Sequence, residues 1–128
     1  MGVLVDTSIW IDFFRGGRHS RALDALLDED EAVTNDLILA ELIPALVLRG
    51  ERRVVAMLRA VQRPPLRIDW PGLVDLQVRC LRRGANGIGI PDLIIAQHAL
   101  QADFAVYSLD RHFRLLADVA GVRLFAAA

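Results

Sequence analysis

The stretch GVLVDTSIWIDFFRGG (residues 2–17) begins with an apolar run and ends with two glycines. Its first part, GVLV, is a short continuous apolar segment, which is typical of a strand buried on both faces of a sheet. Asp6 ends this run, and Thr7 or Ser8 can cap a helix whose apolar side chains recur at i and i+4 until the glycines stop it. A strand followed at once by a helix is the repeating unit of an α/β fold.

The same alternation continues along the chain. Further strands are expected at 32–34, 66–68, 104–108 and 122–125. Helices are expected at 20–28, 35–48, 51–62, 70–83, 91–101 and 110–118. Strands that alternate with helices predict a parallel sheet covered by helices on both faces, and we expect one such domain over residues 1–128.

Composition indicates a protein of the cytoplasm with no membrane span. Apolar residues make up 54% of the chain, and mean hydropathy is +0.35. The longest apolar stretch, residues 37–48, contains Glu41 and Pro44 and is shorter than the about 20 residues a bilayer requires. Asp6 and Asp12 interrupt the apolar segment that a secretory signal peptide would need near the N-terminus. Cys80 is the only cysteine, so an internal disulfide and a cysteine metal cluster are both excluded.

Charge is distributed unevenly although the net charge is only −1. Residues 1–48 hold three arginines against nine acids, whereas residues 49–67 hold six arginines against one. All fifteen basic residues are arginine. The absence of lysine argues against a receiver-type signalling domain, which needs one beside its phosphorylated aspartate. Phosphatases of the haloacid dehalogenase type need Asp-x-Asp after the first strand, whereas here Asp6 is followed by Thr7 and Ser8.

Two aspartates follow expected strands. Asp6 ends the first, and Asp110 comes shortly after the strand at 104–108. The carboxyl ends of parallel strands form one edge of a sheet, where ligand sites lie. Each aspartate could instead simply end a strand or cap the next helix.

Two further acids belong to expected helices. Glu41 lies in the helix at 35–48 among apolar neighbours, so we expect it to be buried, where a carboxylate needs a partner or a metal. A solvent-exposed side chain is the alternative. Asp92 follows Pro91 at the start of the helix at 91–101, where helix-end electrostatics alone would also favour it.

Together these acids predict a cation site. Four carboxylates about 6 Å apart at an effective dielectric of about 20 would repel by roughly 15–20 kcal/mol in all, more than a marginally stable domain tolerates. All-oxygen ligands favour Mg²⁺ or Mn²⁺. The neighbouring hydroxyls could orient metal-bound water or merely cap helices; they belong to Thr7, Ser8 and Ser108.

Four short motifs in order resemble PIN-domain nucleases, and the chain length and spacing resemble the VapC-type toxins of toxin–antitoxin pairs. They are VDTS (5–8), Glu41 in a helix after TND (34–36), GIGIPDLIIAQHAL (87–100) and SLDRHF (108–113). The resemblance implies a three-layer α/β/α fold with a central parallel sheet of about four to five strands. Its acidic set falls on Asp6, Glu41, Asp92 and Asp110, with Ser108 in place of a frequent threonine.

The resemblance also implies an activity, a cofactor and partners. The expected activity is Mg²⁺- or Mn²⁺-dependent hydrolysis of RNA, with tRNA or rRNA as substrate and 5′-phosphate and 3′-hydroxyl ends on the products. Asp6, Asp92 and Asp110 are the expected metal ligands, and Glu41 is either a ligand or an acid that holds a metal-bound water. A cognate antitoxin and a homodimer or hetero-oligomer are the expected assemblies. The alternative is a PIN-fold protein that binds RNA or a partner without cutting.

One position departs from the family pattern. The last motif often has a second acid where this chain has His112, which puts a fifth carboxylate and a second metal in doubt. We expect His112 to be an ordinary surface residue, with metal or phosphate contact as the alternative. No histidine near the acids suggests itself as a general base.

RNA contacts need positive charge around an acidic site. Arg15 and Arg111 are the candidates, although many arginines here fit a solvated helix face. The aromatic residues Trp10, Phe13 and Phe14 fit the core, or in part the border of an antitoxin groove.

Overall fold

The computed structural model describes residues 2–127 and contains one parallel sheet with strand order β2-β1-β3-β4. The strands are β1 (Val3–Val5), β2 (Ala32–Val33), β3 (Ala105–Tyr107) and β4 (Arg123–Leu124). The helices are α1 (Thr7–Phe14), α2 (Ser20–Asp28), α3 (Asp36–Leu48), α4 (Arg52–Ala60), α5 (Trp70–Arg82), α6 (Ile90–Ala102) and α7 (His112–Ala120).

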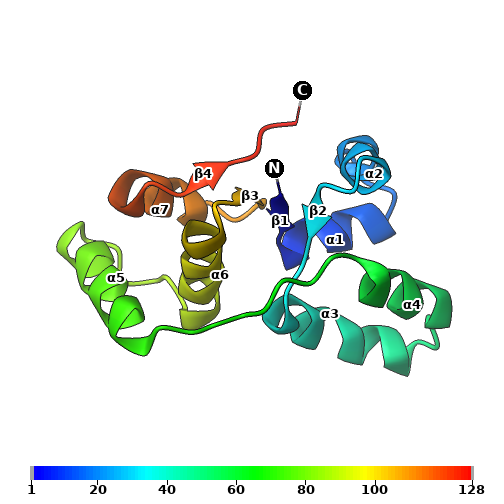
Figure 1. Cartoon of the computed structure of the whole chain (residues 1–128), viewed down its shortest axis with the longest axis horizontal. Coiled ribbons are helices and arrows are strands. Elements are labelled where there is room, and N and C mark those ends of the chain that lie inside the picture. Colours follow the sequence, from blue (N-terminus) through cyan, green and yellow to red (C-terminus); the bar gives the residue numbers. More distant parts are fainter. Residues whose placement is uncertain (1, 128) are drawn as a thin grey trace.

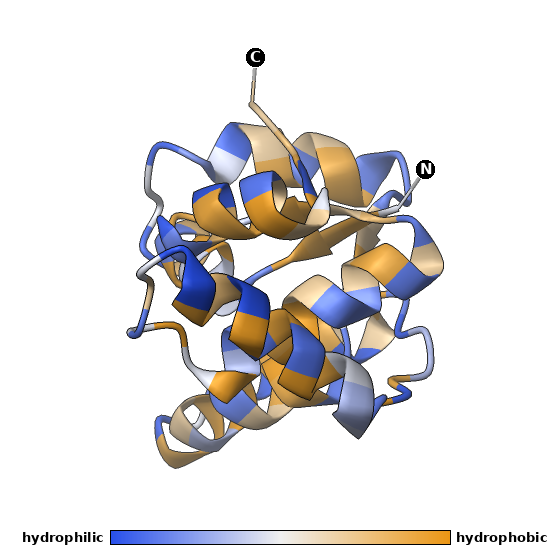
Figure 2. Cartoon of the chain, turned by 90° about the vertical axis from the view of Figure 1, so that its left-hand side faces the viewer, coloured by the Kyte–Doolittle hydropathy of each residue, from blue (hydrophilic) through white to orange (hydrophobic). Residues whose placement is uncertain are grey.

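Helices cover both faces of the sheet. α1 and α2 lie on one side of the strands, whereas α6 and α7 lie on the other (Figure 1). Figure 2 shows the strands as an apolar centre between helices that carry apolar and hydrophilic residues on different sides. The three-layer α/β/α fold with a central parallel sheet is therefore confirmed.

The direction of the chain reverses at the centre of the sheet. From β1 the chain moves outward to β2, then crosses back to β3 and continues to β4 on the other side. Since crossovers between parallel strands are right-handed, opposite directions put the connecting helices on opposite faces. The helices after β1 and β3 therefore diverge, and in open α/β sheets such a point is where a crevice for ligands lies beyond the carboxyl ends of the strands.

The strand expected at 66–68 is absent, and that prediction was wrong. These residues belong to an extended connection that runs from α4 to α5 (Figure 1). Its pairing with the sheet is one bridge, Val33 to Gln62, after which Pro64 and Pro65 have no N–H groups to continue a ladder. Two bonds between Gln97 and the backbone of Asp69 then attach the connection to α6.

The central helix is α6, in which seven consecutive residues, 93–99, are buried. A helix buried on all sides has no polar stripe, so its two polar members need partners within the protein. Gln97 binds the Asp69 backbone, and His98 binds Asn35, the residue that caps α3. Within residues 2–127, no helix is long and apolar enough to cross a membrane.

Candidate metal centre

Asp6 and Ser108 lie at the crevice where the sheet changes direction. Val5 pairs with Tyr107 in the register of β1 and β3, so the residues that follow these strands are neighbours. Asp6 is only 7% exposed although it carries a carboxylate. Its position matches the place where open α/β sheets build their sites.

Two serine hydroxyls hold the Asp6 carboxylate. Ser108 donates to Asp6 Oδ2 at 2.7 Å, and Ser8 donates to the same oxygen at 3.2 Å. Each hydroxyl also accepts a backbone N–H from the turn after β3, from Asp110 to Ser108 and from Leu109 to Ser8. The serines therefore fix the carboxylate and the turn that carries Asp110 as one unit.

Glu41 reaches the same region from α3. Its Oε1 accepts a hydrogen bond of 3.1 Å from Thr7 Oγ1, at the start of α1. Partial burial of the Glu41 carboxylate raises its pKa above the usual value; the Thr7 bond opposes this rise, while the charges of Asp6 and Asp92 add to it. The charges that raise its pKa therefore belong to two other acids of the expected set.

The predicted burial of Glu41 was wrong. The residue as a whole is exposed, because α3 buries only one face although nearly all of it is apolar. At the far end of the same helix, Val47 and Leu48 are 60% and 89% exposed. Glu41 thus lies at the mouth of the site rather than in its floor.

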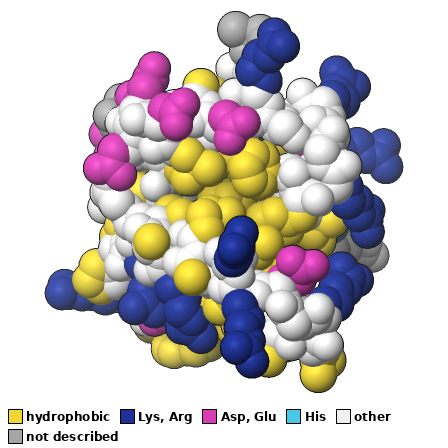
Figure 3. Space-filling view, turned by 90° about the vertical axis from the view of Figure 1, so that its right-hand side faces the viewer, with side chains coloured by type: hydrophobic (Ala, Val, Ile, Leu, Met, Phe, Trp, Pro, Cys, Tyr) yellow, Lys and Arg dark blue, Asp and Glu magenta, His cyan; other side chains and the backbone are white. Residues whose placement is uncertain are grey.

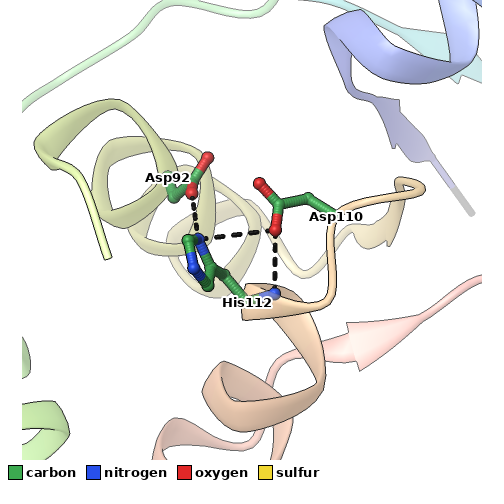
Figure 4. Close-up of side chains that lie close together, drawn as sticks. All are labelled: Asp92, Asp110 and His112. Atoms are coloured by element: carbon green, nitrogen blue, oxygen red, sulfur yellow. Dashed lines mark hydrogen bonds and ion pairs between the residues drawn. The ribbon is translucent and has the colours of Figure 1, made fainter. Parts of the chain in front are cut away.

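Asp92, Asp110 and His112 form the other side of the site (Figure 4). His112 Nδ1 lies 3.0 Å from Asp92 Oδ2 and 3.4 Å from Asp110 Oδ1. The His112 backbone N–H donates to Asp110 Oδ1 at 2.9 Å, which orients this carboxylate at the start of α7. One ligand atom from each of the three residues lies within 4.8 Å of the others.

Asp92 is the most enclosed member of this group, with a side chain 19% exposed against 37% for Asp110 and 41% for His112. Burial raises its pKa, the hydrogen bond from His112 opposes the rise, and the charges of Asp110 and Asp6 add to it. The charge of Asp6 therefore contributes to the raised pKa of both Asp92 and Glu41. The structure thus groups Asp92 with Asp110, holds Asp6 through Ser108 beside the turn that carries Asp110, and bonds Glu41 to Thr7, the residue after Asp6.

A family comparison accounts for this arrangement. The PIN domain pattern matches residues 3–119, which is most of the chain. The chain belongs to the PIN-domain family. The PIN-like fold expected from the sequence is thereby confirmed, and members of this family are nucleases that generally use divalent metals.

Solved structures share the fold of this PIN domain at low sequence identity. VapBC2 from Rickettsia felis, bound to a promoter DNA fragment, superposes with a TM-score of 0.79 at 16% identity over 100% of both chains. FitAcB from Neisseria gonorrhoeae gives 0.73 at 22% identity, covering 97% of this chain and 96% of the other. The Sarcin-Ricin loop cleaving toxin VapC20 of Mycobacterium tuberculosis superposes with a TM-score of 0.62 at 17% sequence identity. The match covers 95% of this chain and 99% of the other. No curated protein sequence matches the chain.

The residues of this PIN domain fit a divalent cation. Asp92 on α6 and Asp110 before α7 lie together with His112, and burial and like charge raise the pKa of Asp92 and of Glu41 on α3. A dication would relieve both effects, and carboxylate oxygens suit hard ions such as Mg²⁺ and Mn²⁺. Thr7, Ser8 and Ser108 bond to carboxylates here, and contacts of these hydroxyls to metal-bound water remain a prediction.

His112 was misjudged from the sequence. It is not an ordinary surface residue, because its ring contacts two acids of the site. The available signal was spacing: it follows Asp110 by two residues, where the family often carries an acid.

The two arginines named as RNA contacts lie in different places. Arg111 is exposed next to Asp110 and lines a cavity of about 510 Å³ with it. Arg15 is eight residues beyond Thr7, which is about 12 Å along a helix. It lines a separate groove between α1, α3 and α4. The geometry therefore favours Arg111 over Arg15 as a neighbour of bound RNA.

Proposed function

We propose that this PIN domain is a divalent-metal-dependent endoribonuclease and the toxin of a toxin–antitoxin pair. The observation that carries the proposal is the grouping of Asp92 and Asp110 with His112, next to the buried Asp6 that Ser108 and Ser8 hold. The charge of Asp6 also raises the pKa of both Glu41 and Asp92. Such a collection of like charges costs stability unless a cation binds it. The activity is placed in the cytoplasm, where RNA substrates are found.

Each residue has a proposed role. Asp6, Asp92 and Asp110 hold Mg²⁺ or Mn²⁺, which when bound supplies a water of lowered pKa and offsets charge on the scissile phosphate. Ser8 and Ser108 keep the Asp6 carboxylate turned toward the site. Glu41, held by Thr7 at the mouth, either joins these ligands or orients the attacking water.

RNA would approach along the side of the site that carries Arg111. The acids alone repel phosphate, so a nearby cation must offset them. Arg111 lies beside the opening lined by residues 85–88, Asp110 and His112, where a phosphate could reach both the arginine and the acids. The proposed substrate class is tRNA or rRNA; among similar structures, VapC20 is described as cleaving the Sarcin-Ricin loop.

Cleavage of RNA by the purified chain tests this proposal. The protein, free of any inhibitor, would be incubated with tRNA and rRNA in Mn²⁺, in Mg²⁺ and in EDTA. We expect cutting with either metal and none in EDTA, with 5′-phosphate ends on the products. Asp6→Asn and Asp92→Asn should be inactive, whereas Asp75→Asn, an exposed acid on α5, should cut normally. If folded wild type binds RNA but cuts none of a broad panel in either metal, the binding-only alternative is correct.

An apolar groove is the proposed site of the antitoxin. It has a volume of about 260 Å³ between α1, α3 and α4, and its lining is mostly apolar with two arginines and one glutamate. The lining residues are Ile11, Phe14, Arg15, Leu42, Ala45, Leu46, Arg49, Glu51 and Val54. Figure 3 shows apolar side chains gathered on the side that carries α2 and α4, with acidic side chains along their upper left edge and arginines below and to the right. Three similar structures are VapBC or FitAB-type complexes, which supports a protein inhibitor for this chain.

Of the three aromatic residues considered for this groove, only Phe14 lines it. Trp10 is fully buried and packs on both phenylalanine rings.

For a homodimer, the proposed contact is the outer face of α5, where exposed apolar residues recur at helical spacing: Trp70, Val74, Val78 and Leu81. Light scattering of the isolated chain measures whether it is a monomer or a dimer.

A further inference from the structure

The position of His112 adds a nitrogen donor to a site that is otherwise carboxylate. Its Nδ1 points between Asp92 and Asp110 (Figure 4). Its Nε2 lies beside the loop at Gly87. The ring comes from the first turn of α7, so the helix fixes where the nitrogen lies relative to Asp110.

The separations around Nδ1 match those of neighbouring ligands on one ion. Two atoms that each lie about 2.1 Å from an octahedral dication, at right angles, are about 3 Å apart. Nδ1 is 3.0 Å from Asp92 Oδ2 and 3.4 Å from Asp110 Oδ1. A hydrogen bond from the ring to Asp92 gives the same 3.0 Å, and the two arrangements differ in whether nitrogen contacts the metal.

We infer that His112 is a metal ligand and makes this centre select first-row transition-metal dications such as Mn²⁺ over Mg²⁺. This inference rests on the proposed metal site. Mg²⁺ keeps an oxygen shell, whereas imidazole is a good ligand for transition metals. With Nδ1 on the ion, Nε2 carries the ring proton and faces the cavity beside residues 85–88, where water can accept it.

Metal binding without RNA tests the inference. Titration calorimetry would give the dissociation constants of Mn²⁺ and Mg²⁺ for tag-free wild type, His112→Asp and His112→Ala. We expect the preference for Mn²⁺ over Mg²⁺ to be at least about tenfold larger in wild type than in His112→Asp, since losing a metal ligand costs at least what losing its supporting partner does. His112→Asp replaces the imidazole with a carboxylate, whereas His112→Ala leaves no ligand at this position. Comparing the two variants separates the effect of losing a nitrogen ligand from the effect of losing a ligand altogether.

Pulsed electron paramagnetic resonance of bound Mn²⁺ supplies a direct readout. Wild type should show the modulation of a directly bound imidazole nitrogen, and His112→Asp should lack it. His19→Gln is the matched control, because His19 bonds to Tyr107 and not to the site acids. The third histidine, His98, is buried against Asn35.

The outcomes separate this inference from the proposed function. Nitrogen modulation that disappears in His112→Asp, in a protein that cuts no RNA, supports the inference and contradicts the nuclease. RNA cleavage by a protein that lacks nitrogen modulation supports the nuclease and overturns the inference. An unchanged metal preference in His112→Asp also overturns the inference and leaves the nuclease to the cleavage assay.

Discussion

Asn35 donates its side-chain amide to the ring of His98 across 3.0 Å, and so connects the start of α3 to the middle of α6. The amide oxygen of Asn35 already caps the first turn of α3, so its NH₂ group faces the ring and Nδ1 accepts. The proton then lies on Nε2, beside the Pro65 carbonyl. Since α3 carries Glu41 and α6 carries Asp92, this contact joins two of the elements that build the site.

Loss of the Asn35 side chain should destabilise the protein twice over. Asn35→Ala removes a helix cap worth about 1 kcal/mol and leaves a buried ring nitrogen unpaired at about 1–3 kcal/mol. We expect urea denaturation to show a loss of roughly 2–4 kcal/mol in the free energy of unfolding. Asn86→Ala, in an exposed loop, should change it little. A loss no larger than that of the control would mean that the contact contributes nothing.

Acid should destabilise the fold through His98. Burial lowers the pKa of His98, so the folded chain keeps the ring neutral while the unfolded chain takes up a proton below about pH 6.5. The contribution of His98 to the free energy of unfolding is therefore complete above that pH. It is lost as the pH falls toward the pKa of the folded state, by at most about 1.4 kcal/mol per pH unit. The stability of wild type relative to His98→Gln should fall between pH 7.5 and 5.5. Glu41 and Asp92 titrate in both proteins, so their effects on stability cancel in the comparison. A stability difference between the two proteins that does not change with pH would contradict the prediction.

Metal should reverse the effect of Asp92 on stability. The raised pKa of Asp92 means that its ionised form is disfavoured in the fold, so Asp92→Asn should melt at a higher temperature than wild type in EDTA. Mn²⁺ at 100 times its dissociation constant should stabilise wild type by about 2.7 kcal/mol and the variant much less. Thermal melts with and without Mn²⁺ measure both effects. Equal stabilisation of the two proteins by Mn²⁺ would show that Asp92 is no ligand.

Ser108 should matter for catalysis through Asp6. Ser108→Ala removes the 2.7 Å bond to Asp6 and the acceptor for the Asp110 N–H. We expect RNA cleavage and Mn²⁺ affinity to fall about 10-fold to 100-fold, as for other groups that orient ligands. Ser108→Thr keeps the hydroxyl and should retain activity. An active alanine variant, or a threonine variant as impaired as alanine, would exclude this positioning role.

A charge in the apolar groove should separate inhibition from catalysis. Ile11 is 38% exposed at the groove and is not among the acids or hydroxyls of the site. Ile11→Glu should cut RNA like wild type but bind the antitoxin at least about tenfold more weakly, because a charge in an apolar contact must be desolvated. Cleavage assays with added antitoxin check this, with Asp75→Asn as control. Unchanged inhibition of Ile11→Glu would place the inhibitor elsewhere.

The sequence predicted the sheet edge of the site well, because the relevant signals are local. The apolar runs before Asp6 and before Ser108 mark buried strands, and parallel strands end at a common edge. The extent of the sheet was harder to predict. Residues 66–68 have strand-like composition but no edge to pair with, since the prolines before them interrupt the ladder.

The burial of Glu41 and the role of His112 depended on tertiary packing. An apolar helix does not reveal which of its faces another element covers, so the exposure of Glu41 could not be derived from α3 alone. The contact between His112 and Asp92 joins α7 to α6, twenty residues apart in the chain. No local sequence pattern predicts a contact between these two residues. The one available signal was that His112 occupies the position where the family often carries a second acid.

Anomalous diffraction at the manganese edge, from crystals grown with Mn²⁺, locates the ion directly. We predict a peak within coordination distance of Asp6, Asp92 and Asp110, with Glu41 bound to the ion or to one of its waters. No peak at this crevice under saturating Mn²⁺, or a peak elsewhere on the molecule, would contradict the metal centre on which the nuclease assignment depends.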